Sequence, residues 1–141
     1  MIDAGSINEA LTLIATDVRD LTVVAKRAPT DTITGRHQQR TERLLERAVG
    51  RMIEINHRVV SAMGQPSPDD HASFVALGRS GILSQDVADR MAAAVGLRNA
   101  IVHGYAAVDA VTLNDAVERL VADGPVYLDA IARYLGSRAR S

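Results

Sequence analysis

The apolar residues of this chain recur at intervals of three and four along almost its whole length, and no stretch shows a convincing alternation at intervals of two. A period near 3.6 puts apolar side chains on one face of an α-helix, whereas a strand needs a period of two. Glycine and proline fall between the periodic stretches, which indicates short connections. This pattern predicts an all-α fold, an antiparallel bundle of about five helices.

The expected helices cover about residues 6–28, 32–63, 68–79, 85–104 and 113–134. The last contains Gly124-Pro125, and a proline inside a helix removes a backbone donor and clashes with the preceding turn. We therefore expect that helix to be kinked or broken there. Residues suited to helix starts precede four of the helices: Ser6, which forms a capping box with Glu9, and Ser67, Ser84 and Thr112.

The bulk properties of the chain narrow the class of protein. Its 141 residues, 47% of them hydrophobic, suffice for one domain, which we expect to span residues 1–141. There is no cysteine, so disulfides and thiolate metal sites are excluded. The net charge of −1 means that any contact with RNA must come from a local patch. We expect a cytoplasmic protein, because neither a membrane-spanning run nor a secretory signal is present.

The side chains best suited to a functional site are concentrated in one eight-residue stretch at the end of the expected fourth helix. This stretch is Arg98-Asn99-Ala100-Ile101-Val102-His103-Gly104-Tyr105. Arg98 occupies a position on the apolar seam of that helix where the pattern calls for an apolar residue. Burying an unpaired guanidinium is very costly, so this charge indicates a functional site or an interface. The alternatives are a structural ion pair for Arg98, a helix-dipole contact for His103, and a core position for Tyr105.

A second line of the same helix carries small residues and then hydrogen-bonding ones, in the order Ala92, Gly96, Asn99 and His103. A symmetric partner laid along this line would bring Asn99 and His103 of both chains together. Arg98 and His103 lie about 140° apart on one helix, so a single helix does not aim them at one point. We therefore expect a homodimer with a composite cleft between the two fourth helices.

The pattern Arg-x4-His-x-Tyr at Arg98, His103 and Tyr105 resembles the motif of the HEPN superfamily, and in particular the HepT-like toxins. The stretches 42–56, 74–83 and 106–109 also resemble that family. The resemblance implies a helical homodimer in a type VII toxin–antitoxin system with an MntA-like nucleotidyltransferase as antitoxin. It also implies an endoribonuclease that cleaves tRNA or mRNA without a metal or cofactor.

The resemblance further implies roles for four residues of this chain. Arg98 and His103 would be the catalytic pair, with Asn99 in support, and Tyr105 would be the tyrosine that the antitoxin modifies with AMP. Histidine titrates near neutrality and suits proton transfer, while arginine binds phosphate oxygens. An arginine and a histidine can also bind phosphate without cleaving it. The alternative function is therefore a noncatalytic HEPN dimer that binds and regulates a nucleotidyltransferase or a nucleotide.

Arginines also recur at helical spacing on the polar face of the expected second helix, at Arg36, Arg40, Arg43, Arg47 and Arg51. Such a row could follow an RNA backbone or meet an acidic antitoxin. The alternative is a solvated face balanced by the glutamates of the same helix. Asn56, near the apolar side of that helix, is expected to be a satisfied polar group in the core.

Overall fold

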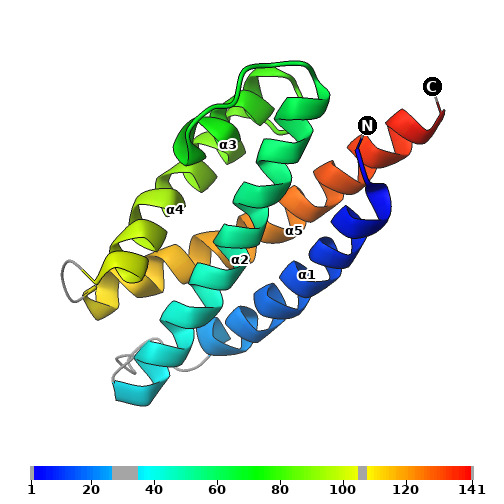
Figure 1. Cartoon of the computed structure of the whole chain (residues 1–141). Helices are drawn as coiled ribbons and strands as arrows, with labels where there is room; N and C mark the ends of the chain where they lie inside the picture. Colours follow the sequence, from blue (N-terminus) through cyan, green and yellow to red (C-terminus); the bar gives the residue numbers. More distant parts are fainter. Residues whose placement is uncertain (1, 27–34, 105–107, 141) are drawn as a thin grey trace.

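The computed structural model describes residues 2–26, 35–104 and 108–140. The predicted all-α fold is confirmed, since five helices follow one another and the described residues contain no strand (Figure 1). The helices are α1 (Ala4–Lys26), α2 (Gly35–Ala62), α3 (Asp70–Arg79), α4 (Gln85–His103) and α5 (Ala110–Arg140).

The second helix is the centre of the bundle, because α2 contacts each of the other four helices. α1 packs along α2 and α5, while α3 and α4 pack against each other and against α2 (Figure 1). α4 runs back along α2 in the opposite direction, so the end of α4 lies beside the first half of α2. This antiparallel pair positions the motif that the sequence analysis singled out.

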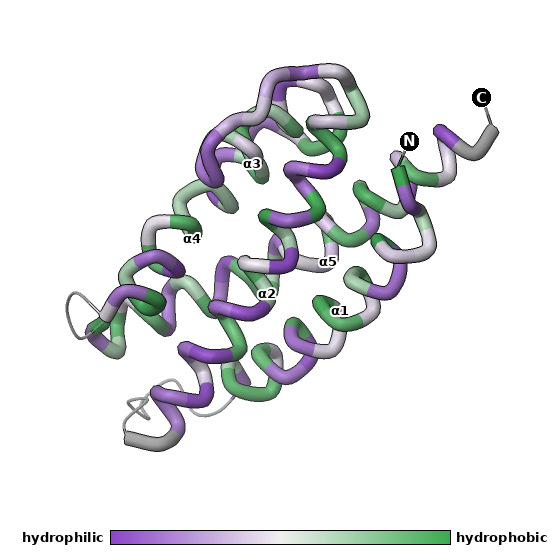
Figure 2. Tube along the Cα trace, viewed as in Figure 1, coloured by the Kyte–Doolittle hydropathy of each residue, from purple (hydrophilic) through white to green (hydrophobic). Residues whose placement is uncertain are grey.

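The core is aliphatic except for two buried aromatic rings, Phe74 and Tyr127, whose centroids lie 6.0 Å apart. The Tyr127 hydroxyl donates to Asn56 Oδ1 at 2.7 Å and to the Met52 carbonyl at 3.1 Å. Asn56 Nδ2 in turn donates to Ser73 Oγ at 3.3 Å, so Asn56 is the satisfied core group that the sequence predicted. Hydrophilic residues predominate along the first turns of α2 (Figure 2). Within the described ranges, no helix is long and apolar enough to cross a membrane.

The helix starts differ from the sequence-based expectation in three of four cases. Ser84 caps α4 as predicted, with its hydroxyl accepting from the Val87 amide at 3.3 Å. For the other three helices, a nearby aspartate accepts the hydrogen bond from the backbone amide instead; Asp3 and Asp109 lie three residues before Ser6 and Thr112, and Asp69 lies two residues after Ser67. The pairs are Asp3 with Ser6 N at 3.1 Å, Asp69 with Ala72 N at 2.7 Å, and Asp109 with Thr112 N at 2.8 Å. A carboxylate adds a full negative charge at the positive end of the helix, which favours aspartate as the capping residue.

The last helix does not break at Gly124-Pro125, because α5 continues as one helix through both residues. α1 passes close to α5 at this point, since a Cβ atom on Gly124 would meet Val18 Cγ2 at 3.0 Å. Gly124 therefore permits close packing of the two helices beside the proline. Packing against α1 supports α5 where Pro125 lacks its backbone donor.

Candidate functional site

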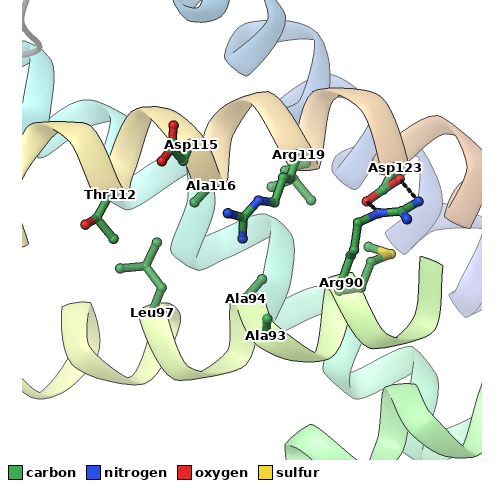
Figure 3. A pocket seen from close by; sticks show the side chains of 11 residues that line it. Arg90, Ala93, Ala94, Leu97, Thr112, Asp115, Ala116, Arg119 and Asp123 are labelled. Carbon is green, nitrogen blue, oxygen red and sulfur yellow. Dashed lines mark hydrogen bonds and ion pairs between the residues drawn. The ribbon is translucent and has the colours of Figure 1, made fainter. Parts of the chain in front are cut away.

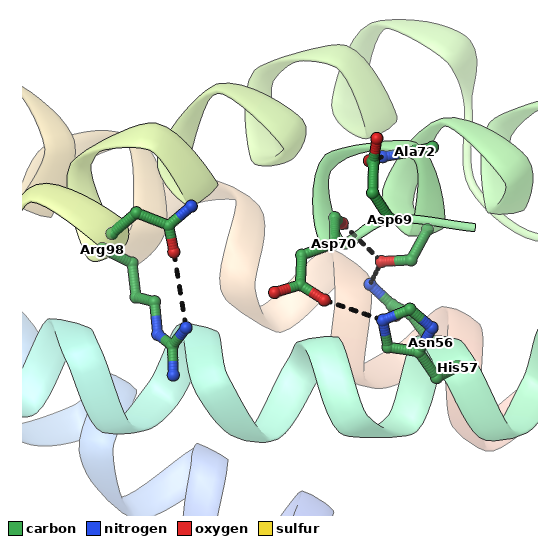
Figure 4. A network of polar contacts seen from close by, with 8 residues as sticks. Asn56, His57, Asp69, Asp70, Ala72 and Arg98 are labelled. Carbon is green, nitrogen blue, oxygen red and sulfur yellow. Dashed lines mark hydrogen bonds and ion pairs between the residues drawn. The ribbon is translucent and has the colours of Figure 1, made fainter. Parts of the chain in front are cut away.

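Arg98 extends from α4 across to α2, with its guanidinium lying against the α2 backbone (Figure 4). The contact is made at Gly50, where a Cβ atom would lie 3.6 Å from Arg98 Nη2 and 3.9 Å from Nε. The Arg98 side chain as a whole is half-buried, but its Nε atom is completely enclosed. The charge predicted on the apolar seam of α4 therefore does face a neighbouring helix.

The hydrogen bonding of Arg98 is sparse for a partly buried guanidinium. Nη1 donates to the side-chain oxygen of Asn99 at 3.4 Å, and the buried Nε has no hydrogen-bond partner. Among the described residues, no carboxylate lies within ion-pair distance of Arg98, whereas Arg47, Arg51 and Arg90 all have one. A buried donor without a partner costs about 1–3 kcal/mol. The alternative of a structural ion pair for Arg98 thus finds no support in the described part of the chain.

His103 is the final residue of α4, and its side chain is exposed. Gly104 follows in the left-handed conformation, with φ of 61°, and donates its amide to the Ala100 carbonyl at 3.0 Å. The helix stays regular through His103, so Arg98 and His103 leave it on different sides. Asn99 lies one turn before His103 and is half-buried. One protomer therefore brings Arg98 and Asn99 together, but does not bring His103 to Arg98.

Tyr105 lies outside the described residues, and Val108, three residues further along the chain, is bound to α2. The amide of Gln38 on α2 donates to the Val108 carbonyl at 2.7 Å, and it also contacts Glu42 Oε1 at 3.3 Å. The next residue, Asp109, caps α5, and the Thr112 amide and hydroxyl lower the pKa of its carboxyl. Gln38 could not be singled out from the sequence, because its role depends on the start of α5 lying beside α2.

Of the five arginines predicted on the polar face of α2, the four whose side chains are described fall into two groups. Arg40 and Arg43 are exposed, and the side chain of Arg36 lies outside the described part. Arg47 and Arg51 instead bind opposite oxygens of Asp17 on α1, at 2.7 and 2.8 Å. Asp17 is only 2% exposed, so this pairing ties α2 to α1.

Sequence reasoning overlooked Asp17, although a signal for it was present. Asp17 lies three residues after Ile14 and four before Leu21, both of which are buried. A carboxylate at that position shares the apolar face of α1 and needs a cationic partner from another helix. The row of arginines on α2 supplies that partner.

A groove of about 270 Å³ lies between α4 and α5, on a part of α4 that does not include Arg98, Asn99 or His103 (Figure 3). Apolar and charged side chains both line this groove, and they include Arg90 and Asp123, which form an ion pair with two hydrogen bonds of 2.9 and 3.0 Å. No group of three or more His, Cys, Asp or Glu side chains in the described ranges could hold a metal ion.

In the described residues, the all-α bundle holds an arginine without a carboxylate partner, and a histidine follows five residues later at the end of the same helix. The family model described as Ribonuclease HepT-like matches residues 13–133. The chain therefore belongs to the HepT-like family of HEPN proteins.

A relative of similar sequence supports this family assignment. A protein named tRNA nuclease HepT, from Aphanizomenon flos-aquae, is 32% identical over 96 residues, covering 67% of this chain and 65% of that relative. The match thus spans just under two thirds of the relative's own length.

Two solved structures share the fold at low sequence identity. YutE from Bacillus subtilis, described as a cytosolic protein of unknown function, superposes with a TM-score of 0.83 at 12% identity and covers 97% of this chain and 93% of YutE. A tri-AMPylated HEPN toxin from Shewanella oneidensis, in complex with an MNT antitoxin, superposes with a TM-score of 0.81 at 21% identity. That match covers 94% of this chain and 99% of the toxin.

Proposed function

We propose that this protein is the toxin of a HepT/MntA-like toxin–antitoxin system and acts as a metal-independent endoribonuclease on tRNA or mRNA. The observation that carries the proposal is the half-buried guanidinium of Arg98, which has one long hydrogen bond and no carboxylate partner in the described part of the chain. A cation held in this way is ready to bind a phosphate. The name of the Aphanizomenon relative, a tRNA nuclease, supports the choice of substrate class.

The proposed reaction needs only the two motif residues and the RNA itself. The 2′-hydroxyl of the ribose attacks the adjacent phosphorus, and the bond to the 5′-oxygen of the next nucleotide breaks. His103 removes the hydroxyl proton and then protonates the departing oxygen, because an imidazole can act first as a base and then as an acid. Arg98 stabilises the negative charge that develops on the phosphate oxygens. Asn99, which accepts from Arg98 Nη1, orients the guanidinium.

The proposal includes a homodimer, because α4 directs Arg98 and His103 to different sides. Two copies of α4 packed along Gly96, Asn99 and His103 would place the Arg98 of one protomer near the His103 of its partner. Gly96 is exposed, and a Cβ atom there would meet nothing within 4 Å, so this face of α4 has room for a second helix. The composite cleft would then hold one arginine and one histidine from different chains.

The proposed antitoxin is an MntA-like nucleotidyltransferase that transfers AMP from ATP to the Tyr105 phenol and releases pyrophosphate. Support comes from the Shewanella toxin, which is described as tri-AMPylated and in complex with an MNT antitoxin. An anionic AMP group close to Arg98 would compete with the RNA phosphate for that cation. Arg40 and Arg43, both exposed, are proposed to contact RNA or this partner.

Incubation of the purified protein with tRNA and mRNA in EDTA tests the ribonuclease activity. We expect cleavage by the wild-type protein and none by Arg98→Ala or His103→Ala, with unchanged helical circular dichroism in both variants. RNA binding without cleavage by the wild-type protein would instead favour a noncatalytic dimer that regulates a nucleotidyltransferase.

A further inference from the structure

Gly50 lies in the interior of α2, where glycine is a poor choice for helix stability. The backbone does not require glycine at this position. The glycines with positive φ in the described ranges are Gly64, Gly81 and Gly104, and Gly50 is not among them. What the absence of a side chain at position 50 provides is the space that a larger side chain would fill.

That space is bordered by the Arg98 side chain. A Cβ atom on Gly50 would lie 3.6 Å from Arg98 Nη2 and 3.9 Å from Nε, which is ordinary van der Waals contact. Alanine would therefore fit, but a longer side chain directed toward α4 would compete with the guanidinium for the same volume. Gly136, another helical glycine, has nothing within 4 Å of a built Cβ, so a larger side chain there would meet no such obstacle.

We propose that Gly50 is a positioning residue for Arg98, and this proposal rests on the proposed ribonuclease function for its consequence in catalysis. The missing side chain leaves a slot on α2 in which the guanidinium lies, with Nε enclosed and Nη1 directed to Asn99. Few polar contacts hold Arg98, so the slot supplies the restraint that an ion pair would otherwise supply. A guanidinium held this way keeps a fixed place for the phosphate charge.

The direct test observes Arg98 itself by ¹⁵N–¹H NMR. The enclosed Nε–H should give a resonance that exchanges slowly with water and disappears in Arg98→Lys, which assigns it. We expect the resonance to persist in Gly50→Ala and in the control Gly136→Leu, and to shift or exchange rapidly in Gly50→Leu. Gly50→Met, with a flexible unbranched side chain, provides a second disruptive variant if Gly50→Leu does not fold. An unchanged resonance in a folded Gly50→Leu or Gly50→Met protein would overturn the proposal.

The catalytic consequence is tested separately with RNA cleavage. We expect Gly50→Leu to lower kcat on the order of tenfold or more, while Gly50→Ala stays within about twofold of wild type. In an Arg98→Lys background, Gly50→Leu should cause no further loss, because the group that it displaces is already gone. Additive losses in this double-mutant comparison would contradict positioning through Arg98. If the wild-type protein does not cleave RNA, the proposed function fails, but the NMR comparison still decides the role of Gly50.

Discussion

Arg98 Nη1 donates a hydrogen bond to the side-chain oxygen of its neighbour Asn99 at 3.4 Å. The distance is long for a guanidinium, whose bonds to charged acceptors are usually about 2.7–2.9 Å. The cation is thus oriented without being neutralised, while its Nε atom remains enclosed and without a partner. Such an arrangement lowers the stability of the folded protein, but it leaves a positive charge that can bind an anion.

Arg98→Leu should accordingly separate stability from activity. The substitution removes an unsatisfied buried donor and breaks no ion pair, so we expect the free energy of unfolding to stay within about 1 kcal/mol of wild type or to rise. RNA cleavage should fall on the order of 100-fold or more. Urea denaturation and single-turnover cleavage measure the two effects. A loss of several kcal/mol with intact cleavage would show that Arg98 is structural.

The double variant Arg47→Met/Arg51→Met should behave in the opposite way. It leaves the carboxylate of Asp17 buried and unpaired, so we expect the free energy of unfolding to fall by about 3 kcal/mol. Urea denaturation measures this loss, and adding Asp17→Leu should recover part of it. Stability equal to that of wild type would mean that Asp17 is neutralised by other means.

Arg40→Met/Arg43→Met is the matched control, since both side chains are exposed on the same helix. We expect its stability to equal that of the wild-type protein. If these arginines contact RNA phosphates, the slope of log affinity against log salt should become shallower by about 1.4, for two contacts with single-stranded RNA. An unchanged slope would remove Arg40 and Arg43 from the RNA-binding surface.

The sequence predicted the helical class and both ends of α4, because Ser84 and Gly104 act through local backbone geometry. It misplaced three helix starts, where a nearby aspartate competed with the expected Ser or Thr for the same role. The sequence also predicted a kink or a break at Gly124-Pro125, whereas α5 continues through both residues without a break. Each difference arose where a charge or a tertiary contact outweighed a local preference.

The candidate site was predictable in composition but not in arrangement. Periodicity placed Arg98 on the apolar seam of α4, and the structure puts it against α2. The identity of its neighbour, Gly50, could not be predicted, because it depends on the relative position of two helices far apart in the sequence. The ion pairs of Asp17 with Arg47 and Arg51 depend in the same way on how α1 packs against α2.

The start of α5 should be sensitive to acid through Asp109. The Thr112 amide and hydroxyl hold the pKa of the Asp109 carboxyl below its ordinary value. A depressed pKa in the folded protein gives stabilisation that is fully present above the unfolded value, about 3.9, and is lost as pH falls through the folded value. NMR titration of the carboxyl checks the direction, and Thr112→Val, which lacks the hydroxyl, should raise that pKa toward normal. An ordinary pKa for the Asp109 carboxyl in the wild-type protein would contradict its role as the N-terminal cap of α5.

Tyr105→Phe should escape control by the antitoxin while keeping ribonuclease activity, because the phenol oxygen is the proposed acceptor of AMP. Intact mass after coexpression with the MntA-like partner should show added AMP on the wild-type protein and on Tyr134→Phe, but not on Tyr105→Phe. Tyr134 is a suitable control because it is a partly exposed tyrosine on α5, away from the motif. AMP addition to Tyr105→Phe would place the modified residue elsewhere.

The composite site is tested most directly by mixing two inactive variants, Arg98→Ala and His103→Ala, and measuring RNA cleavage after subunit exchange. Half of the dimers are then mixed, and each mixed dimer holds one site with an intact arginine from one chain and an intact histidine from the other. Cleavage should return to about one quarter of the wild-type rate in a symmetric dimer. No recovery despite proven subunit exchange would contradict a site shared between Arg98 of one protomer and His103 of its partner.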